Sequence, residues 1–340
     1  MTPVSVTPVS ATPEPALPTD LHTEDTLVTV FGGSGFLGRN VVRALARRGY
    51  RIRVAVRRPD LAGHLQPLGK VGQIHAVQAN LRYPDSVTAA ARDSDVVVNL
   101  VGILTESGAQ RFGAVQGEGA AAVATAAKAA GARLVHVSAI GADADSSSAY
   151  ARSKAAGEKA VRETIPTSIV VRPSVVFGHE DQFTNRFAAL ARIAPVLPLI
   201  GGATKMQPVF VGDVARAIAL AVDGKAHDGA TYEIGGPEVM TMREIIDFIL
   251  KTIERERILV PLPFALAKLK AMFLQFAPGA LKLTPDQVEL LRTDNIVSDT
   301  ANTRHLTLEG LGIVGESMEA VTPSYLWRFR KTGQFRNSTA

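Results

Sequence analysis

A short strand, a glycine-rich turn and a helix follow one another between Thr26 and Arg48. Thr26 to Phe31 is apolar and rich in β-branched residues, which is typical of a buried strand. The next residues have the spacing G-x-x-G-x-x-G, which permits a tight turn and lets backbone N–H groups at a helix N-terminus approach a pyrophosphate. A helical pattern runs from Phe36 to Arg48. The segment therefore predicts a nucleotide-phosphate site formed by Gly32, Ser34, Gly35, Phe36, Leu37 and Gly38.

Further apolar segments alternate with helical ones along the first half of the chain. The predicted strands are Arg51 to Val56, a segment ending at Gln78 to Leu81, Asp95 to Leu104, and Arg133 to Val137. This alternation indicates an α/β fold with a doubly wound parallel sheet of the Rossmann type, whose ligand site lies at the carboxyl ends of the strands. Residues near the ends of two of these strands are therefore expected to contact the cofactor: Asn80, Leu81, Val101 and Gly102.

Arg57 and Arg58 stand where an NAD-binding fold usually places an acidic residue on the adenosine ribose. Arginines after a strand are by default exposed surface charges. Their position, about 20 residues after the glycine turn, favours instead the binding of a 2′-phosphate by guanidinium groups, so NADP(H) is favoured over NAD(H). The chain has no cysteine to ligate an iron–sulfur cluster, and its histidines show no metal-binding spacing. We expect neither a metal ion nor an iron–sulfur cluster.

Tyr150 and Lys154 are one helical turn apart in a segment that follows the fifth predicted strand and Ser138. A nearby ammonium favours the phenolate, so the lysine can lower the pKa of the tyrosine towards neutral pH. A surface pair on a helix would show the same spacing. Because the pair follows both a glycine turn and a strand that leads into a serine, we expect Tyr150, Lys154 and Ser138 to form a catalytic site.

These motifs resemble those of the short-chain dehydrogenase/reductase superfamily, in its extended or atypical branch. The resemblance extends from Leu27 to at least Leu250 and includes residues 172–178, 208–215 and 232–237. Within that branch the chain is particularly similar to the NAD(P)H-binding accessory subunits of respiratory complex I and their bacterial relatives, through residues 136–141, 150–159 and 178–183. The resemblance implies that Pro173 and Val176 also contact the cofactor.

The resemblance also implies a mechanism, in which Tyr150 is the general acid and base, Lys154 lowers its pKa and holds a ribose, and a serine polarises the substrate. Two departures count against turnover. Ala139 stands where many active members have the working hydroxyl, and Asn80 and Gln116 stand where relatives often have Asp and Asn. The resemblance therefore implies an accessory, structural or assembly subunit of complex I in which NADP(H) is mainly structural. The alternatives are a free NADP-dependent oxidoreductase, epimerase or dehydratase, and a nucleotide-sensing regulator.

The sequence divides into three parts. Residues 1–26 contain Thr-Pro and Val-Ser units and are acidic, without Lys or Arg, which predicts a disordered tail. Residues 27–178 are the predicted NADP-binding Rossmann domain, and residues 179–340 are a smaller, mostly helical substrate or partner region. Within the latter we expect residues 208–236 to return to the sheet. Capping boxes predict two helices there, beginning after Thr241 and Thr284.

The C-terminal region also carries features that suggest a partner. Residues 258–277 are nearly all apolar, with Lys268 and Lys270 as the charged residues, which fits either a helix at a membrane or subunit interface or a buried core helix. The end of the chain is basic, through Arg328, Arg330, Lys331 and Arg336. No segment has the length of a transmembrane helix, and the N-terminus lacks the features of a signal or transit peptide. We expect a cytoplasmic protein, peripheral on the cytoplasmic face of the inner membrane, that binds complex I subunits and no nucleic acid.

Overall fold

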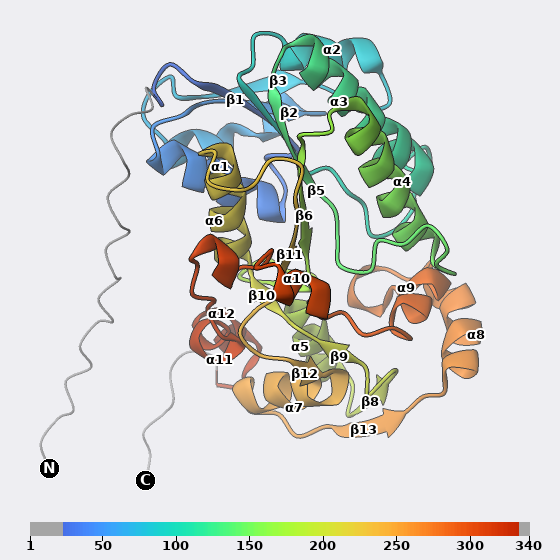
Figure 1. The fold of residues 1–340 in the computed structure, drawn as a ribbon. Helices are drawn as coiled ribbons and strands as arrows, with labels where there is room; N and C mark the ends of the chain where they lie inside the picture. Colours follow the sequence, from blue (N-terminus) through green and yellow to red (C-terminus); the bar gives the residue numbers. More distant parts are fainter. Residues whose placement is uncertain (1–22, 333–340) are drawn as a thin grey trace, which may run out of the picture.

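Seven parallel strands form the central sheet of the computed structural model, which describes residues 23–332 (Figure 1). Their order across the sheet is β3, β2, β1, β4, β5, β6 and β11, so the order reverses between β1 and β4, and the predicted doubly wound α/β class is confirmed. Of the predicted acidic tail, residues 1–22 lie outside the described residues. The strands are β1 (Leu27–Phe31), β2 (Arg51–Val56), β3 (Ile74–Gln78), β4 (Val96–Asn99), β5 (Arg133–Val137), β6 (Ile169–Pro173) and β11 (Thr231–Ile234).

Strand β4 ends earlier than predicted, whereas β1, β2 and β5 lie close to their predicted positions. The chain leaves the sheet after Asn99, because the side-chain oxygen of Asn99 accepts a hydrogen bond from the backbone N–H of Val101 at 3.1 Å. This local turn has no counterpart in the hydrophobic pattern, which continues to Leu104. It brings Val101 and Gly102 to the carboxyl edge of the sheet.

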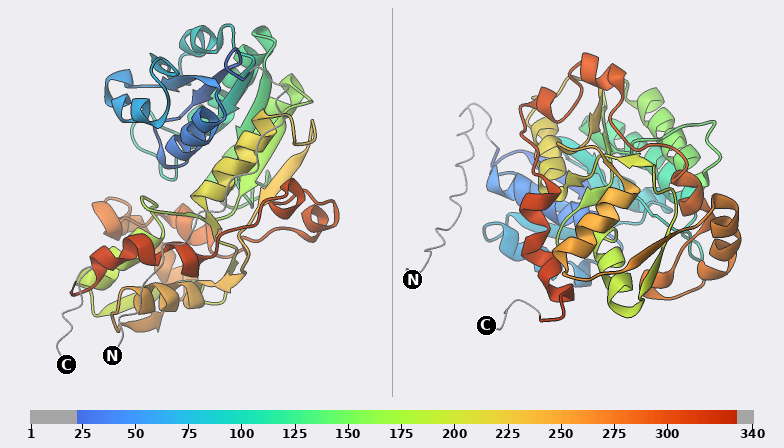
Figure 2. Two further views of the ribbon diagram at one scale, coloured as in Figure 1. Left: turned by 90° about the vertical axis from the view of Figure 1, so that its left-hand side faces the viewer. Right: turned by 90° about the horizontal axis from the view of Figure 1, so that it is seen from below.

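Two sets of helices cover the two faces of the sheet, as Figures 1 and 2 show. One face carries α1 (Phe36–Arg47) and α6 (Val211–Val222), and the other carries α2 (Pro84–Ala91), α3 (Glu118–Ala129) and α4 (Ala149–Thr164). Both faces bury apolar side chains of the strands, as expected for a parallel sheet. The buried residues of α3 are mostly alanines, which lets α3 pack closely between α2 and α4.

The remaining elements lie mainly beyond the carboxyl ends of the strands (Figure 2). Three pairs of short strands form there, β7 with β10, β9 with β12 and β8 with β13. The capping boxes at Thr241 and Thr284 begin α7 and α9, which confirms both predicted helix starts. The strands are β7 (Val176–Phe177), β8 (Val196–Leu199), β9 (Lys205–Met206), β10 (Val209–Phe210), β12 (Met240–Thr241) and β13 (Ile258–Pro261). The helices are α5 (Thr184–Ile193), α7 (Met242–Thr252), α8 (Phe264–Leu274), α9 (Pro285–Leu290), α10 (Asp299–Thr303), α11 (Met318–Val321) and α12 (Pro323–Leu326).

The apolar segment 258–277 forms β13 and α8 at the surface. On α8 the buried residues are Ala267 and Ala271, and the helix packs on α9. Larger apolar side chains face solvent, and Phe273 and Phe276 are 74% and 84% exposed. The interpretation of this segment as a core helix therefore does not hold. Between residues 23 and 332, no helix combines the length and the hydropathy that crossing a bilayer requires.

The basic C-terminal end is largely bound to the protein itself. The buried carboxylate of Asp181 accepts a hydrogen bond from the hydroxyl of Tyr325 at 3.1 Å, which fixes α12 next to α5. Arg328 donates to an asparagine side chain of α5 at 2.6 Å, and Arg330 donates to a backbone carbonyl of α7 at 3.0 Å. Two of the cations expected to face a partner are thus engaged within the fold. Arg336 lies outside the described residues.

Candidate functional site

The glycine turn places the N-terminus of α1 at the carboxyl end of β1. Gly32 has a φ of +82°, and a Cβ added at Gly38 would lie 2.3 Å from the Gly32 carbonyl oxygen, so the turn depends on glycine at both positions. Gly35 is the N-cap of α1, with no hydrogen bond from a side-chain cap and no acidic residue in the first turn of the helix. Backbone N–H groups at this end of α1 are therefore available to an anion.

A cavity of about 450 Å³ begins at this turn and follows the carboxyl ends of β1 to β4. It brings together residues predicted from separate motifs: Gly32, Ser34, Gly35, Phe36, Leu37, Gly38, Arg57, Asn80, Leu81, Val101, Gly102 and Tyr150. Sequence analysis missed Ile103, Leu104 and Gln110, which also line the cavity. These three residues belong to the loop after β4, whose sequence contains no motif that would mark them.

Arg57 and Arg58 differ in their surroundings. Arg57 lines the cavity, and its guanidinium has no hydrogen bond or ion pair with residues 23–332. Arg58 does not line the cavity, and its guanidinium binds the carboxylate of Asp60, with an Nη2 to Oδ2 distance of 2.6 Å. Both members of that pair are exposed. The end of β2 therefore presents one unpaired cation to the cavity.

Tyr150 and Lys154 lie in the first two turns of α4, next to the cavity. The Tyr150 ring lines the cavity and contacts the Phe112 ring edge to face, with 5.9 Å between the ring centroids. The Lys154 ammonium lies 5.9 Å from the Tyr150 ring centroid and donates to the Val137 carbonyl oxygen at 3.3 Å. A Cβ on Gly102 would lie 3.2 Å from that ammonium. Lys154 is therefore buried directly behind the cavity wall.

The electrostatics of this pair differ from those of a tyrosine that exchanges protons at neutral pH. Burial, and after it the carboxylate of Asp286, raise the pKa of Tyr150 to about 12. Burial lowers the pKa of Lys154 to about 8, against the opposing effect of Glu158. The sequence predicts that the Lys154 ammonium lowers the pKa of the Tyr150 phenol towards neutrality. In the structure the pKa of this phenol is instead raised.

Ser138, Pro173 and Val176 do not line the cavity. The Ser138 hydroxyl is buried and has no hydrogen-bond partner within residues 23–332. The same is true of the side-chain nitrogens His136 Nε2 and Gln116 Nε2, and burial lowers the pKa of His136 to about 3, so its imidazole is neutral. Ser138 therefore contributes no hydroxyl to the cavity surface.

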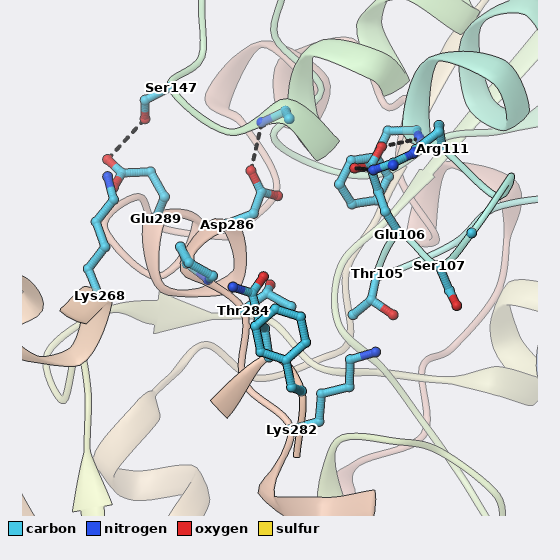
Figure 3. A pocket seen from close by; sticks show the side chains of 16 residues that line it. Thr105, Glu106, Ser107, Arg111, Ser147, Lys268, Lys282, Thr284, Asp286 and Glu289 are labelled. Carbon is cyan, nitrogen blue, oxygen red and sulfur yellow. Dashed lines mark hydrogen bonds and ion pairs between the residues drawn. The ribbon is translucent and has the colours of Figure 1, made fainter. Parts of the chain in front are cut away.

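A second cavity has a volume of about 680 Å³, and Figure 3 shows the residues that line it. Phe112 lines the second cavity and contacts Tyr150, which lines the first. One side of the second cavity is α9, where Asp286 accepts hydrogen bonds from the Ala149 N–H at 2.7 Å and the Ser148 hydroxyl at 2.9 Å. Sequence analysis identified the start of α9 but not this contact, because its two sides are far apart in the chain.

The residues of the first cavity fit a bound dinucleotide. The α1 N-terminus offers donors to a pyrophosphate, and side chains at Gly32 or Gly38 would obstruct the turn. Arg57 supplies a free cation, and the Lys154 ammonium has one backbone acceptor, which leaves N–H groups for a hydroxyl of the ligand. In the part of the chain from residue 23 to 332, no three His, Cys, Asp or Glu side chains are grouped so that they could hold a metal ion.

Comparison with known proteins supports the same assignment of the fold. The model of the NAD-dependent epimerase/dehydratase family matches residues 28–235. The chain is 35% identical, over 92% of its length and 80% of the relative, to the mitochondrial NADH dehydrogenase [ubiquinone] 1 alpha subcomplex subunit 9 of Arabidopsis thaliana. It is 37% identical to the ceramide reductase of Caulobacter vibrioides, over 56% of its own length and 59% of that protein. A solved NADPH-dependent quinone oxidoreductase of Escherichia coli has the same fold, with a TM-score of 0.69 over 88% of this chain and 99% of that chain at 20% identity.

Proposed function

The chain belongs to the NAD-dependent epimerase/dehydratase family, and from this premise we propose that it is an accessory, structural or assembly subunit of respiratory complex I. The observation that carries the proposal is the 35% identity, over 92% of the chain, to a subunit of a mitochondrial NADH dehydrogenase. Its partners are then other complex I subunits.

In this proposal a bound nucleotide stabilises the fold. The α1 N-terminus and its glycine turn hold the pyrophosphate, and Lys154 and Tyr150 hold the nicotinamide ribose. A ligand that binds only the native state adds about 2.7 kcal/mol to the free energy of unfolding at a hundredfold excess over its Kd. When bound, the nucleotide could also supply a hydride. Two observations disfavour that use of it, since the pKa of Tyr150 is raised to about 12 and the Ser138 hydroxyl is away from the cavity.

We propose NADP(H) rather than NAD(H) as this nucleotide. Arg57 is the residue assigned to the 2′-phosphate, because its guanidinium faces the cavity without a partner among the described residues. Arg58 is assigned at most a minor part, since Asp60 already binds it.

Of the segment 208–236 that we expected to return to the sheet, β11 joins the central sheet, whereas β10 pairs with β7 outside it. We further propose that residues 27–178, together with β11, act as the nucleotide-binding domain and that the rest of 179–340 faces partners. The protein is then peripheral on the cytoplasmic face of the inner membrane. The exposed apolar side of α8 and its lysines, rather than the basic C-terminal end, are the part of the surface suited to a membrane.

A second candidate function is the NADP-dependent reduction of a lipid carbonyl. The identity of 37% to a ceramide reductase favours it, as does the position of Tyr150 in the cavity wall with Lys154 buried directly behind that wall. In that case Tyr150 would donate the proton that accompanies hydride transfer, despite its raised pKa.

One experiment separates the two functions. The protein is purified from its native membranes, the copurifying proteins are identified, and any bound nucleotide is assayed for a change of redox state. Copurification with NADH dehydrogenase subunits and a nucleotide that is not turned over support the accessory role. Migration as a small free species, with lipid-dependent NADPH oxidation that Tyr150→Phe abolishes, would support the reductase instead.

A further inference from the structure

The larger cavity, beside α9, contains polar groups that no described neighbour uses. Figure 3 shows the side chain of Lys282 extending into the cavity, with its ammonium towards Thr105. Neither this ammonium nor the hydroxyls of Thr105 and Ser107 form a hydrogen bond or ion pair with any residue between 23 and 332. The cavity therefore offers an ammonium and two hydroxyl groups to a ligand.

The acidic groups of the same wall are engaged by their neighbours. Asp286 accepts hydrogen bonds from the N-terminus of α4, the shortest at 2.7 Å. Glu289 and Glu106 each form an ion pair at 3.3 Å, the first with a lysine of α8 and the second with an arginine of the loop after β4. The charge in this wall that has no partner is thus the Lys282 ammonium. A ligand with an anionic group is favoured.

The cavity adjoins the exposed apolar side of α8. Phe276 connects the two, because its side chain lines the cavity and is also mostly exposed. The neighbouring apolar side chains of α8 that face solvent are Leu266, Leu269, Met272 and Phe273. Residues 258–284 contain three lysines and no acidic residue. An anion-binding cavity that continues into an apolar, cationic surface matches a ligand with an anionic head and an apolar tail.

We propose that this cavity binds the headgroup of an anionic glycerophospholipid, whose acyl chains lie on the exposed side of α8. The phosphodiester is held by the Lys282 ammonium and by the hydroxyls of Thr105 and Ser107. The inference rests on the proposed membrane-facing role and specifies the lipid class that α8 meets. A defined headgroup site of this kind is distinct from the general attraction of a basic surface to an anionic bilayer.

The test uses the full chain and a lipid that forms no bilayer. Dihexanoyl phosphatidylglycerol, kept below its critical micelle concentration, is titrated into the protein by calorimetry, with dihexanoyl phosphatidylcholine and glycerol 3-phosphate in parallel. We expect phosphatidylglycerol to bind more tightly than both. Lys282→Gln should weaken its binding about tenfold, as expected for the loss of a hydrogen bond to a charged group.

Lys270→Gln is the matched control, because it also removes one positive charge. Lys270 lies on α8 and does not line the cavity. This variant should change the affinity less than twofold, and Thr105→Val, a second variant in the cavity, should weaken binding without removing charge. Equal losses in Lys282→Gln and Lys270→Gln would overturn the headgroup site. So would glycerol 3-phosphate binding as tightly as the lipid, or displacement of the lipid by NADPH, which would place it in the other cavity. Because isolated protein and monomeric lipid are used, the result does not depend on whether the chain copurifies with NADH dehydrogenase.

Discussion

Replacement of Lys154 by methionine should stabilise the protein at neutral pH. Lys154 is 6% exposed, and burial lowers its pKa from the ordinary 10.5 to about 8. Because a pKa difference of one corresponds to about 1.4 kcal/mol, the charged lysine costs about 3 kcal/mol of stability at pH 7. Methionine avoids this cost but loses the hydrogen bond to the Val137 carbonyl, worth about 1 kcal/mol. We therefore expect a net gain of about 2 kcal/mol.

The pH dependence of this gain identifies its cause. Between about pH 8 and 10.5 the unfolded chain binds more protons at Lys154 than the folded chain, so the free energy of unfolding of the wild type rises with pH across this window. The advantage of Lys154→Met should accordingly be full well below pH 8 and disappear near pH 10. Above pH 10.5 the variant should be less stable than the wild type by about 1 kcal/mol, which is the contribution of the lost hydrogen bond. Urea unfolding of nucleotide-free protein, followed by circular dichroism at pH 7, 8.5 and 10, measures it.

The wild type is the control for this experiment. The ordinary titration of other groups is common to both proteins, so the difference between variant and wild type isolates Lys154. A difference that stays constant from pH 7 to pH 10, or a variant that is less stable at pH 7, would refute the reasoning. Either result would mean that the ammonium is satisfied where it lies, for example by the nearby Glu158.

Three further predictions follow from the site. Gly38→Ala should abolish nucleotide binding and lower the thermal unfolding midpoint, because the added Cβ would lie 2.3 Å from a backbone oxygen of the turn; unchanged NADPH affinity in a calorimetric titration would contradict the assignment of the turn. Arg57→Ala should weaken NADPH binding about tenfold more than NADH binding, as for one charge-assisted hydrogen bond, whereas Arg58→Ala should change both less than twofold; equal losses of the two nucleotides would remove the 2′-phosphate argument. Asp286→Asn should lower the pKa of Tyr150, because it removes the carboxylate that helps to raise it; absorbance at 295 nm, with Tyr150→Phe subtracted, follows the phenolate, and an unchanged titration would show that burial alone sets that pKa.

The features predicted well from the sequence are those that depend on neighbouring residues. The glycine turn has its strand, its turn and its helix within one short segment, and the conformations of Gly32 and Gly38 follow from that local geometry. The capping boxes that begin α7 and α9 are local for the same reason. Each of these signals is read within a few residues of where it acts.

The features that the sequence does not predict depend on contacts between distant segments. The carboxylate of Asp286 reaches the N-terminus of α4 only because α9 folds back against it. The backbone N–H of Ser138 donates to the Val171 carbonyl oxygen of β6 at 2.8 Å, and the sequence around Ser138 does not show this contact. The pairing of Arg58 with Asp60 is an exception, because these residues are only two positions apart in the chain. For the segment 258–277, composition could not decide whether its large apolar side chains face a core or solvent. That outcome depends on α9 packing against the alanines of α8.

The position of β11 in the sheet has a consequence for how the chain is synthesised. Strand β6 pairs with β5 on one side and with β11 on the other, and β11 comes from residues 231–234, after α5, α6 and most of the short strands. Until that segment leaves the ribosome, β6 is an open edge of apolar residues, which is a template for pairing with another chain. A nascent or truncated chain that stops before Thr231 should therefore aggregate or require a chaperone, although it already contains the whole glycine turn.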